Sequence, residues 1–381
     1  MPSINITSDL EYLAIFITVL ILPKVVQRLK VPSGITALII GIALSKLDPT
    51  ISGEPIFRFL SQIGITSLFL FAGLEVETSE LKEDKGYLFK YLSKYTMALS
   101  IVAFSLHSLF DWSWQVALIF SLGILTPSAG FILNSLHSFN VNEDHEYWIK
   151  SKAISKEIVS ILLMFIALQW AEPKNMIFSS LFFIGLFIFL PKIFRLFFKF
   201  ISPYAPNSEI PFLVALSLIS GVVSKELGAY YLIGAFIVGI IGSQFKKSIF
   251  KDGEDALFRS LSSFFNVFLP FYFFYAGTKI DLSLLSLNAF LYAITLFVIF
   301  IPIRILLIKS SLTFFMKEII ENTYKVSFSL MPTLIFGLVI SGILIERKLI
   351  PYEYSYALII YTILTSIFPS IMFSLKRFKE H

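Results

Sequence analysis

The chain of 381 residues is 56% hydrophobic and only 15% charged, and it contains 42 Phe and no Cys. This composition indicates a polytopic membrane protein and argues against a soluble enzyme. The absence of Cys excludes disulfides, thiolate catalysis and Cys-ligated metal centres. The four His residues are not at metal-ligand spacing, and basic loops explain the net charge of +5. We therefore expect no metal centre, no cofactor and no nucleic-acid partner.

Stretches that are apolar and long enough to span a bilayer recur about thirteen times. The expected spans are 10–28, 31–47, 57–75, 86–109, 114–136, 148–170, 176–200, 209–225, 229–245, 258–278, 285–308, 322–345 and 353–375. The loops between them are short and leave no room for a soluble domain. We predict an all-α polytopic protein in which residues 1–381 form one transmembrane domain of about 13 helices.

The distribution of Lys and Arg predicts the orientation in the membrane. With an odd number of spans the two termini lie on opposite sides. Placing the N-terminus outside puts about 21 basic residues on the cytoplasmic side and about 7 outside, which is the bias that short cytoplasmic loops show. We predict a multi-pass protein of a bacterial inner membrane with a cytoplasmic C-terminus.

Two spans are interrupted in their middle by proline beside polar residues. Thr126, Pro127 and Ser128 lie within span 114–136, and Pro332 and Thr333 lie within span 322–345. Proline removes a backbone donor and breaks the helical ladder. In lipid, the freed carbonyls need partners from protein, water or ions. The interruptions predict two broken helices, although ordinary proline kinks would produce the same pattern.

The two interruptions lie seven spans apart, and this spacing predicts inverted repeats. The first repeat covers about 10–170 and the second about 209–375, and the helix at about 176–200 links them. Broken helices that meet and cross at the membrane midplane are the usual binding site of transporters built in this way.

Span 148–170 carries two adjacent ionisable residues, Lys156 and Glu157, near its centre. A charge at the bilayer midplane costs at least ~2.5–3.5 kcal/mol and usually faces the bundle interior or a water-filled path. A structural ion pair is the alternative, but adjacent residues on a helix point in different directions. Glu157 is therefore the leading candidate for a site that binds a cation or a proton.

Four segments in this order resemble motifs of the monovalent cation:proton antiporter superfamily. The similarity is to the sodium/hydrogen exchanger family, in the branch with Kef-type systems and plant cation/proton exchangers. The segments are Arg28 to Pro32 with Gly34 and Gly41, Gly64 with Leu68 to Glu75, Leu227-Gly228 with Ile233 to Gly239, and Leu269 to Phe274 with Gly277 and Asp281. The resemblance implies a core domain with crossed, partly unwound helices that moves against a dimerisation domain.

The resemblance also implies site residues. The sixth span of the family carries a pair ending in a carboxylate that binds the cation or the proton, and the matching positions are Lys156 and Glu157. Lys156 departs from the family pattern, which has an acid or an amide there. Lys279 is the candidate for the family's basic residue near span ten, but it could equally reach the outer interface beside Asp281. The polar residues of the broken helices match at Thr126, Ser128 and Thr333.

The predicted function is exchange of Na+ or K+ for H+ by a homodimer, with Glu157 as the site for which cation and proton compete. Two alternatives stay open: a non-transporting sensor on the same fold, and an anion carrier that uses Lys156 and Lys279. For Lys156 itself, three readings remain. It is neutral because it is buried, it pairs with a carboxylate such as Glu75 or Asp281, or it marks a chain that has lost transport.

Overall fold

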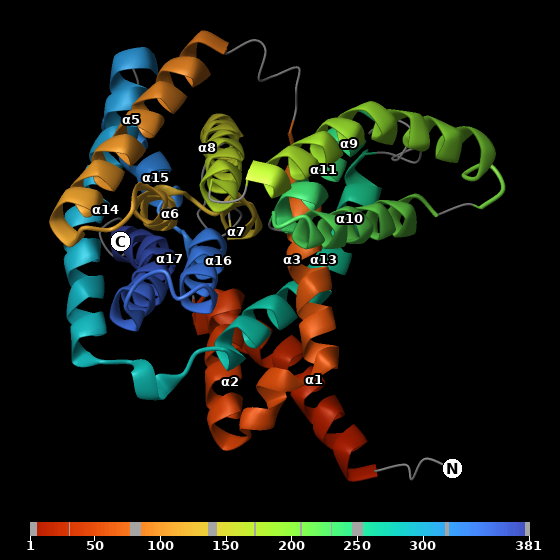
Figure 1. Ribbon diagram of the computed structural model, residues 1–381, viewed down its shortest axis with the longest axis horizontal. Coiled ribbons are helices and arrows are strands. Elements are labelled where there is room, and N and C mark those ends of the chain that lie inside the picture. Colours follow the sequence, from red (N-terminus) through yellow and green to blue (C-terminus); the bar gives the residue numbers. More distant parts are fainter. Residues whose placement is uncertain are drawn as a thin grey trace. The chain divides into compact units, whose positions relative to one another are not determined.

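The computed structural model describes residues 6–29, 31–76, 85–135, 143–170, 173–205, 208–229, 231–245, 254–316 and 320–377. Within these ranges every regular element is helical (Figure 1), so the predicted all-α class is confirmed. The chain forms two compact units. The first unit comprises Met1–Leu68 and Lys246–Leu282, and the second comprises Phe69–Phe245 and Ser283–His381.

The first unit contains α1 (Ile6–Val26), α2 (Ser33–Leu47), most of α3 (Pro55–Leu74) and α13 (Glu254–Thr278), with short 3-10 turns at Gln27–Leu29 and Pro49–Gly53. Glycines let α2 and α13 pack backbone to backbone. A Cβ built on Gly41 would collide with the carbonyl oxygen of Phe274, and one on Gly277 would collide with that of Leu38. Two glycines of the family motifs are therefore sites of close helix packing.

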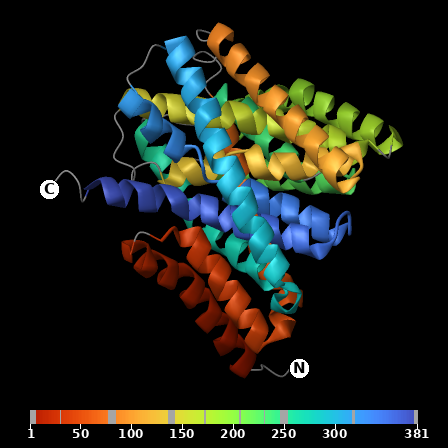
Figure 2. The same cartoon turned by 90° about the vertical axis from the view of Figure 1, so that its left-hand side faces the viewer.

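The second unit holds the remaining helices. They are α5 (Lys85–Phe110), α6 (Trp114–Leu125), α7 (Ala129–Ser135), α8 (Glu143–Gln169), α9 (Pro173–Phe200), α10 (Glu209–Glu226), α11 (Tyr231–Ser243), α14 (Leu287–Met316), α15 (Ile320–Ser329), α16 (Leu334–Glu346) and α17 (Tyr352–Arg377). Helix α14 lies against α17 and crosses it obliquely (Figure 2). Gly73 at the end of α3 and Gly239 in α11 also contact each other through their backbones.

Each predicted span coincides with one helix or with one broken pair, α6–α7 or α15–α16. Both predicted interruptions are present: the helix is broken at 126–128 and again at 330–333. Among the described residues, 7 helices are long and apolar enough to cross a membrane by length and composition. A multi-pass membrane protein is therefore confirmed, while the count of thirteen crossings stays a prediction.

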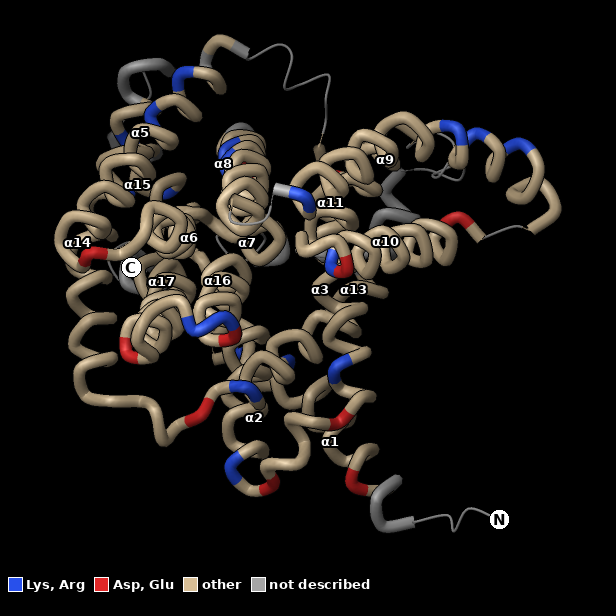
Figure 3. Tube along the Cα trace, in the orientation of Figure 1, with Lys and Arg blue, Asp and Glu red and all other residues tan. Residues whose placement is uncertain are grey.

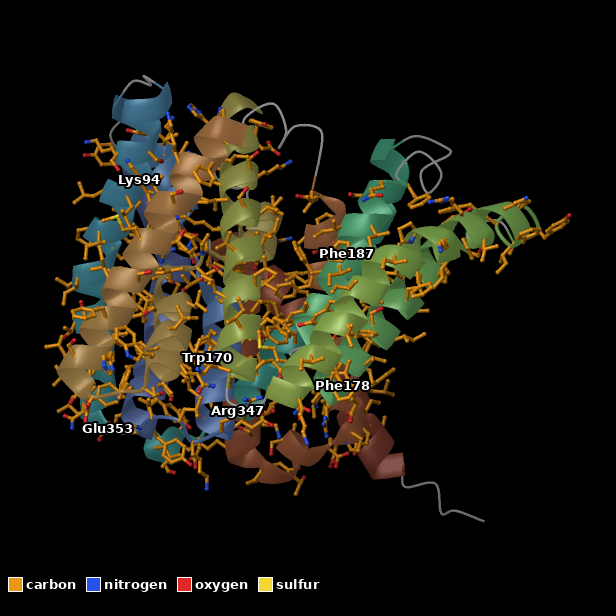
Figure 4. All side chains as sticks on the ribbon, turned by 45° about the horizontal axis from the view of Figure 1, so that its top comes forward. Lys94, Trp170, Phe178, Phe187, Arg347 and Glu353 are labelled. Atoms are coloured by element: carbon orange, nitrogen blue, oxygen red, sulfur yellow. The ribbon has the colours of Figure 1, made fainter. Side chains whose placement is uncertain are left out.

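Burial separates central helices from lipid-facing ones in the second unit. The apolar windows of the two broken helices are 94% and 89% buried, whereas those of α9 and α14 are only 22% buried. Phe178 and Phe187 project from α9 with 60% and 50% of their surface exposed (Figure 4). Helices α6 and α11 carry no charged residue (Figure 3). The broken helices therefore form the interior, and α9 and α14 present apolar faces suited to lipid.

We predict that Gly277→Ala and Gly41→Ala each destabilise the protein by about 1–3 kcal/mol, because the added methyl group overpacks a backbone contact. Thermal unfolding in detergent measures the loss. Gly342→Ala in α16 is the matched control, because no described atom beyond its chain neighbours and the nearby backbone of its own helix lies within 4 Å of the Cβ position there. Equal melting temperatures for Gly277→Ala and Gly342→Ala would contradict this account of the motif.

Candidate ion-binding site

The first broken helix stops where proline interrupts its ladder. Helix α6 ends at Leu125, the Thr126 N–H still donates to the Leu122 carbonyl at 3.0 Å, and Pro127 has no N–H to offer. The chain resumes as α7 at Ala129. The N–H of Ser128, which has no helical acceptor, donates to the carbonyl of Pro332 at 2.9 Å. The backbone N–H freed at the first break therefore forms a hydrogen bond with the second broken helix.

The second broken helix receives a cap from the first. The Ser128 hydroxyl accepts hydrogen bonds from the N–H groups of Ile335 and Phe336, both at 3.0 Å, at the start of α16. A serine oxygen that satisfies the first N–H groups of a helix acts as an N-terminal cap. Here the serine comes from about two hundred residues away in the sequence. The two breaks thus lie directly against each other, as crossed helices require.

Glu157 of α8 lies beside the first break. Its side chain is 1% exposed, and the N–H of Ala129 at the start of α7 donates to its carboxylate. The N-terminus of a helix favours negative charge. The other carboxylate oxygen, Oε1, is buried and has no hydrogen-bond partner among the described residues. One oxygen is therefore held by the protein and the other is open to a proton or a cation.

Three hydroxyl groups form a hydrogen-bonded cluster that joins α8 to α5 and to the first break. The Tyr95 hydroxyl of α5 lies 2.9 Å from Thr126 Oγ1 and 2.6 Å from Ser160 Oγ, and Thr126 donates to Ser160 at 3.0 Å. Ser160 is one turn after Glu157 on α8. Thr126 was predicted, whereas Tyr95 and Ser160 were not. The spacing of Ser160 was a usable signal, but nothing in the sequence indicates that Tyr95 packs here.

Thr333 lies at the second break, as predicted, but its hydroxyl is directed to α17. Its Oγ1 lies 3.0 Å from Thr362 Oγ1 and 2.9 Å from Thr365 Oγ1. Thr333 is fully buried. These contacts tie the second break to α17.

Arg304 of α14 is the basic residue at the crossing. It is 3% exposed, and its Nη2 donates to the carbonyl of Leu330 at 2.9 Å, just after α15 ends. Its Nη1 donates to the Tyr361 hydroxyl at 3.3 Å, and that hydroxyl donates to the Ile124 carbonyl at 3.1 Å near the end of α6. Cations stabilise the C-termini of helices. Arg304 therefore binds the carbonyl end of α15 directly and is linked to that of α6 through Tyr361, a role the sequence did not indicate.

Comparison with known proteins places this chain in a family. Residues 13–375 match the family model described as "Sodium/hydrogen exchanger, transmembrane". The chain belongs to the sodium/hydrogen exchanger family. This confirms the membership of the monovalent cation:proton antiporter superfamily that the motifs predicted.

Two relatives illustrate the similarity of this exchanger-family chain to known proteins. YjbQ of Bacillus subtilis (strain 168), whose assignment as a Na(+)/H(+) antiporter is itself provisional, is 24% identical over 394 aligned positions covering 96% of this chain. The chain spans 63% of that relative's length. The sodium proton antiporter MjNhaP1 from Methanocaldococcus jannaschii, solved at pH 8, superposes with a TM-score of 0.72 at 16% identity, covering 98% of this chain and 100% of that one. The fold of this exchanger-family chain is therefore the antiporter fold.

Lys279 and Asp281 belong to the first unit, whereas the residues of the cluster described above belong to the second. Both are exposed, and Lys279 Nζ donates to the Ser52 carbonyl at 2.7 Å and lies 5.1 Å from the Tyr275 ring centroid. That Lys279 reaches the outer interface stays a prediction.

Lys156 is 6% exposed, and its ammonium lies 5.0 Å from the ring centroids of both Tyr91 and Tyr95. An ion pair with a carboxylate such as Glu75 or Asp281 was one of the three readings. In the part of the second unit that the structure describes, the ammonium of Lys156 contacts tyrosine rings instead of a carboxylate. The sequence could not show this, because the rings come from α5.

We predict that Ser128→Ala lowers the stability of the protein by about 1–2 kcal/mol, the usual cost of losing an N-terminal cap. Thermal unfolding in detergent checks it, with Ser93→Ala as control. The Ser93 hydroxyl donates only to the Phe89 carbonyl on an exposed face of α5. If both variants melt like the wild type, the cap does not hold the crossing together.

Proposed function

We propose that this chain is a secondary transporter that exchanges Na+ or K+ for H+, with Glu157 as the site for which the two ions compete. The observation that carries the proposal is the buried Glu157 carboxylate beside the break of a helix, one oxygen of which has no hydrogen-bond partner among the described residues. Membership of the sodium/hydrogen exchanger family supports it. The relatives named as Na+/H+ antiporters favour Na+ as the first ion to test.

A single carboxylate couples the two ions, because it binds either a proton or a metal ion and never both. A bound proton removes the negative charge that the metal ion needs, and a bound metal ion occupies the oxygen that the proton needs. The hydroxyl of Thr126 lies at the first break and donates to Ser160, one turn after Glu157, and oxygen ligands suit hard cations. The hydroxyls of Ser128 and Thr333 are hydrogen-bonded to other protein groups and hold the two breaks in place.

Transport further requires that Glu157 face the two sides of the membrane in turn. We propose that the repeats at about 10–170 and 209–375, linked by the helix at 176–200, supply alternating access by rigid movement of the core. The proposed setting is a homodimer in a bacterial inner membrane with the N-terminus outside. In this arrangement Pro127 and Pro332 are needed because they keep the helices broken at the binding site.

The test is exchange by purified protein in proteoliposomes loaded with a pH-sensitive dye. We expect added Na+ to drive proton movement in wild type and the signal to vanish in Glu157→Gln, because a neutral amide cannot hold a cation or exchange a proton. Glu146→Gln is the matched control, since it removes a carboxylate from a partly exposed position on the same helix. The half-saturating Na+ concentration of wild type should rise as the pH falls, because protons occupy the same group.

Equal proton movement in wild type and Glu157→Gln would reject Glu157 as the exchange site. No movement in either, with Na+ and then with K+, would favour the non-transporting alternative. Repeating the assay with K+ at the same ionic strength identifies the preferred ion.

A further inference from the structure

One face of α8 carries two buried lysines next to the aromatic residues of α5. Lys152 and Lys156 are 0% and 6% exposed and lie one turn apart. Lys152 Nζ lies 4.6 Å from the Tyr91 ring centroid and 5.5 Å from that of Trp148, and Lys156 Nζ lies 5.0 Å from the centroids of Tyr91 and Tyr95. An ammonium within about 6 Å of a ring face is attracted by the ring, and more strongly where water is excluded.

Glu157 leaves the same helix in another direction. Consecutive residues of an α-helix are rotated by about 100°. Lys156 is directed to the rings of α5, whereas the carboxylate of Glu157 is directed to the Ala129 N–H at the start of α7. The ring of Tyr95 is fixed in turn, because its hydroxyl is hydrogen-bonded to Thr126 and Ser160. Lys156 and Glu157 are thus neighbours on α8, but their side chains point in different directions and do not form an ion pair with each other.

We propose that Lys156 sets the affinity of the transport site: its ammonium, held on the rings of Tyr91 and Tyr95, weakens the binding of the transported cation at Glu157. This inference rests on the exchange function proposed above. A fixed positive charge on the adjacent residue repels an arriving metal ion, and low-dielectric surroundings leave that repulsion poorly screened. The site then fills only at high cation concentration and releases its ion readily. Lys156 acts through electrostatics and is not itself a ligand.

The experiment separates affinity from turnover. In the proteoliposome assay at neutral pH, where Lys156 must carry its charge for the inference to hold, we expect Lys156→Gln to lower the half-saturating Na+ concentration by about tenfold, the effect of a modest charge repulsion. The maximal rate should not fall. Lys156→Arg keeps the charge and should behave like wild type. Lys156→Met, which keeps an apolar stem in the buried site, should reproduce the effect of Lys156→Gln.

Lys152→Gln is the matched control. It removes the same charge from the same face of α8 and from the same Tyr91 ring, but one turn farther from Glu157. We expect its half-saturating Na+ concentration to change by less than about threefold, because the interaction weakens with distance. Stabilisation of detergent-solubilised protein by added Na+, followed by thermal unfolding, gives the same comparison without transport.

The inference is overturned if folded Lys156→Gln and Lys156→Met keep the wild-type Na+ dependence, lose exchange, or change no more than Lys152→Gln. These results leave the proposed function standing as long as wild type exchanges ions and Glu157→Gln does not. Wild type and Glu157→Gln that behave alike would instead remove the exchange function itself.

Discussion

The structure of the second unit depends on how two interrupted helices satisfy the backbone groups that proline sets free. In an apolar interior an unpaired N–H or carbonyl is costly. The two breaks solve the problem for each other, since Ser128 donates its N–H to Pro332 and its hydroxyl caps α16. Arg304 compensates the carbonyl ends on the opposite side of the crossing. Removing one break would therefore leave backbone groups of the other without their hydrogen-bond partners. This explains why the interruptions occur as a pair.

The same constraint places the acidic residue. Once α7 starts at Ala129, its first N–H needs an acceptor, and the Glu157 carboxylate supplies one. The carboxylate accepts from this helix start, while its buried Oε1 has no hydrogen-bond partner in the part of the chain that the structure describes. A buried carboxylate with one oxygen held by a backbone N–H and the other without a hydrogen-bond partner among the described residues is what the proposed exchange at Glu157 requires. The position of Glu157 at the proposed site thus follows from the crossing of the two broken helices.

Much of the fold was predictable from the sequence, because spans, proline breaks and the buried carboxylate are local signals. The glycines at positions 41 and 277 belong to the motifs that resemble the family, but the backbone contacts that require them became visible only in the structure. What could not be predicted is which side chains meet across helices. Arg304 was one basic residue in an apolar span, and Tyr95 was one tyrosine among 16. Apolar periodicity identifies the buried face of a helix but does not name the residue opposite it, so the partners of Lys156 stayed unknown.

The neighbouring charges of α8 are compatible because helical geometry separates them. A buried ammonium without compensation would be costly, and pairing it with Glu157 would close the open carboxylate oxygen. Aromatic rings attract an ammonium without presenting a negative charge of their own, so Tyr91 and Tyr95 hold Lys156 and leave the carboxylate available. The substitution of a lysine where the family resemblance implies an acid or amide is thus accommodated by α5. Its effect falls on the strength of ion binding and not on the architecture of the crossing.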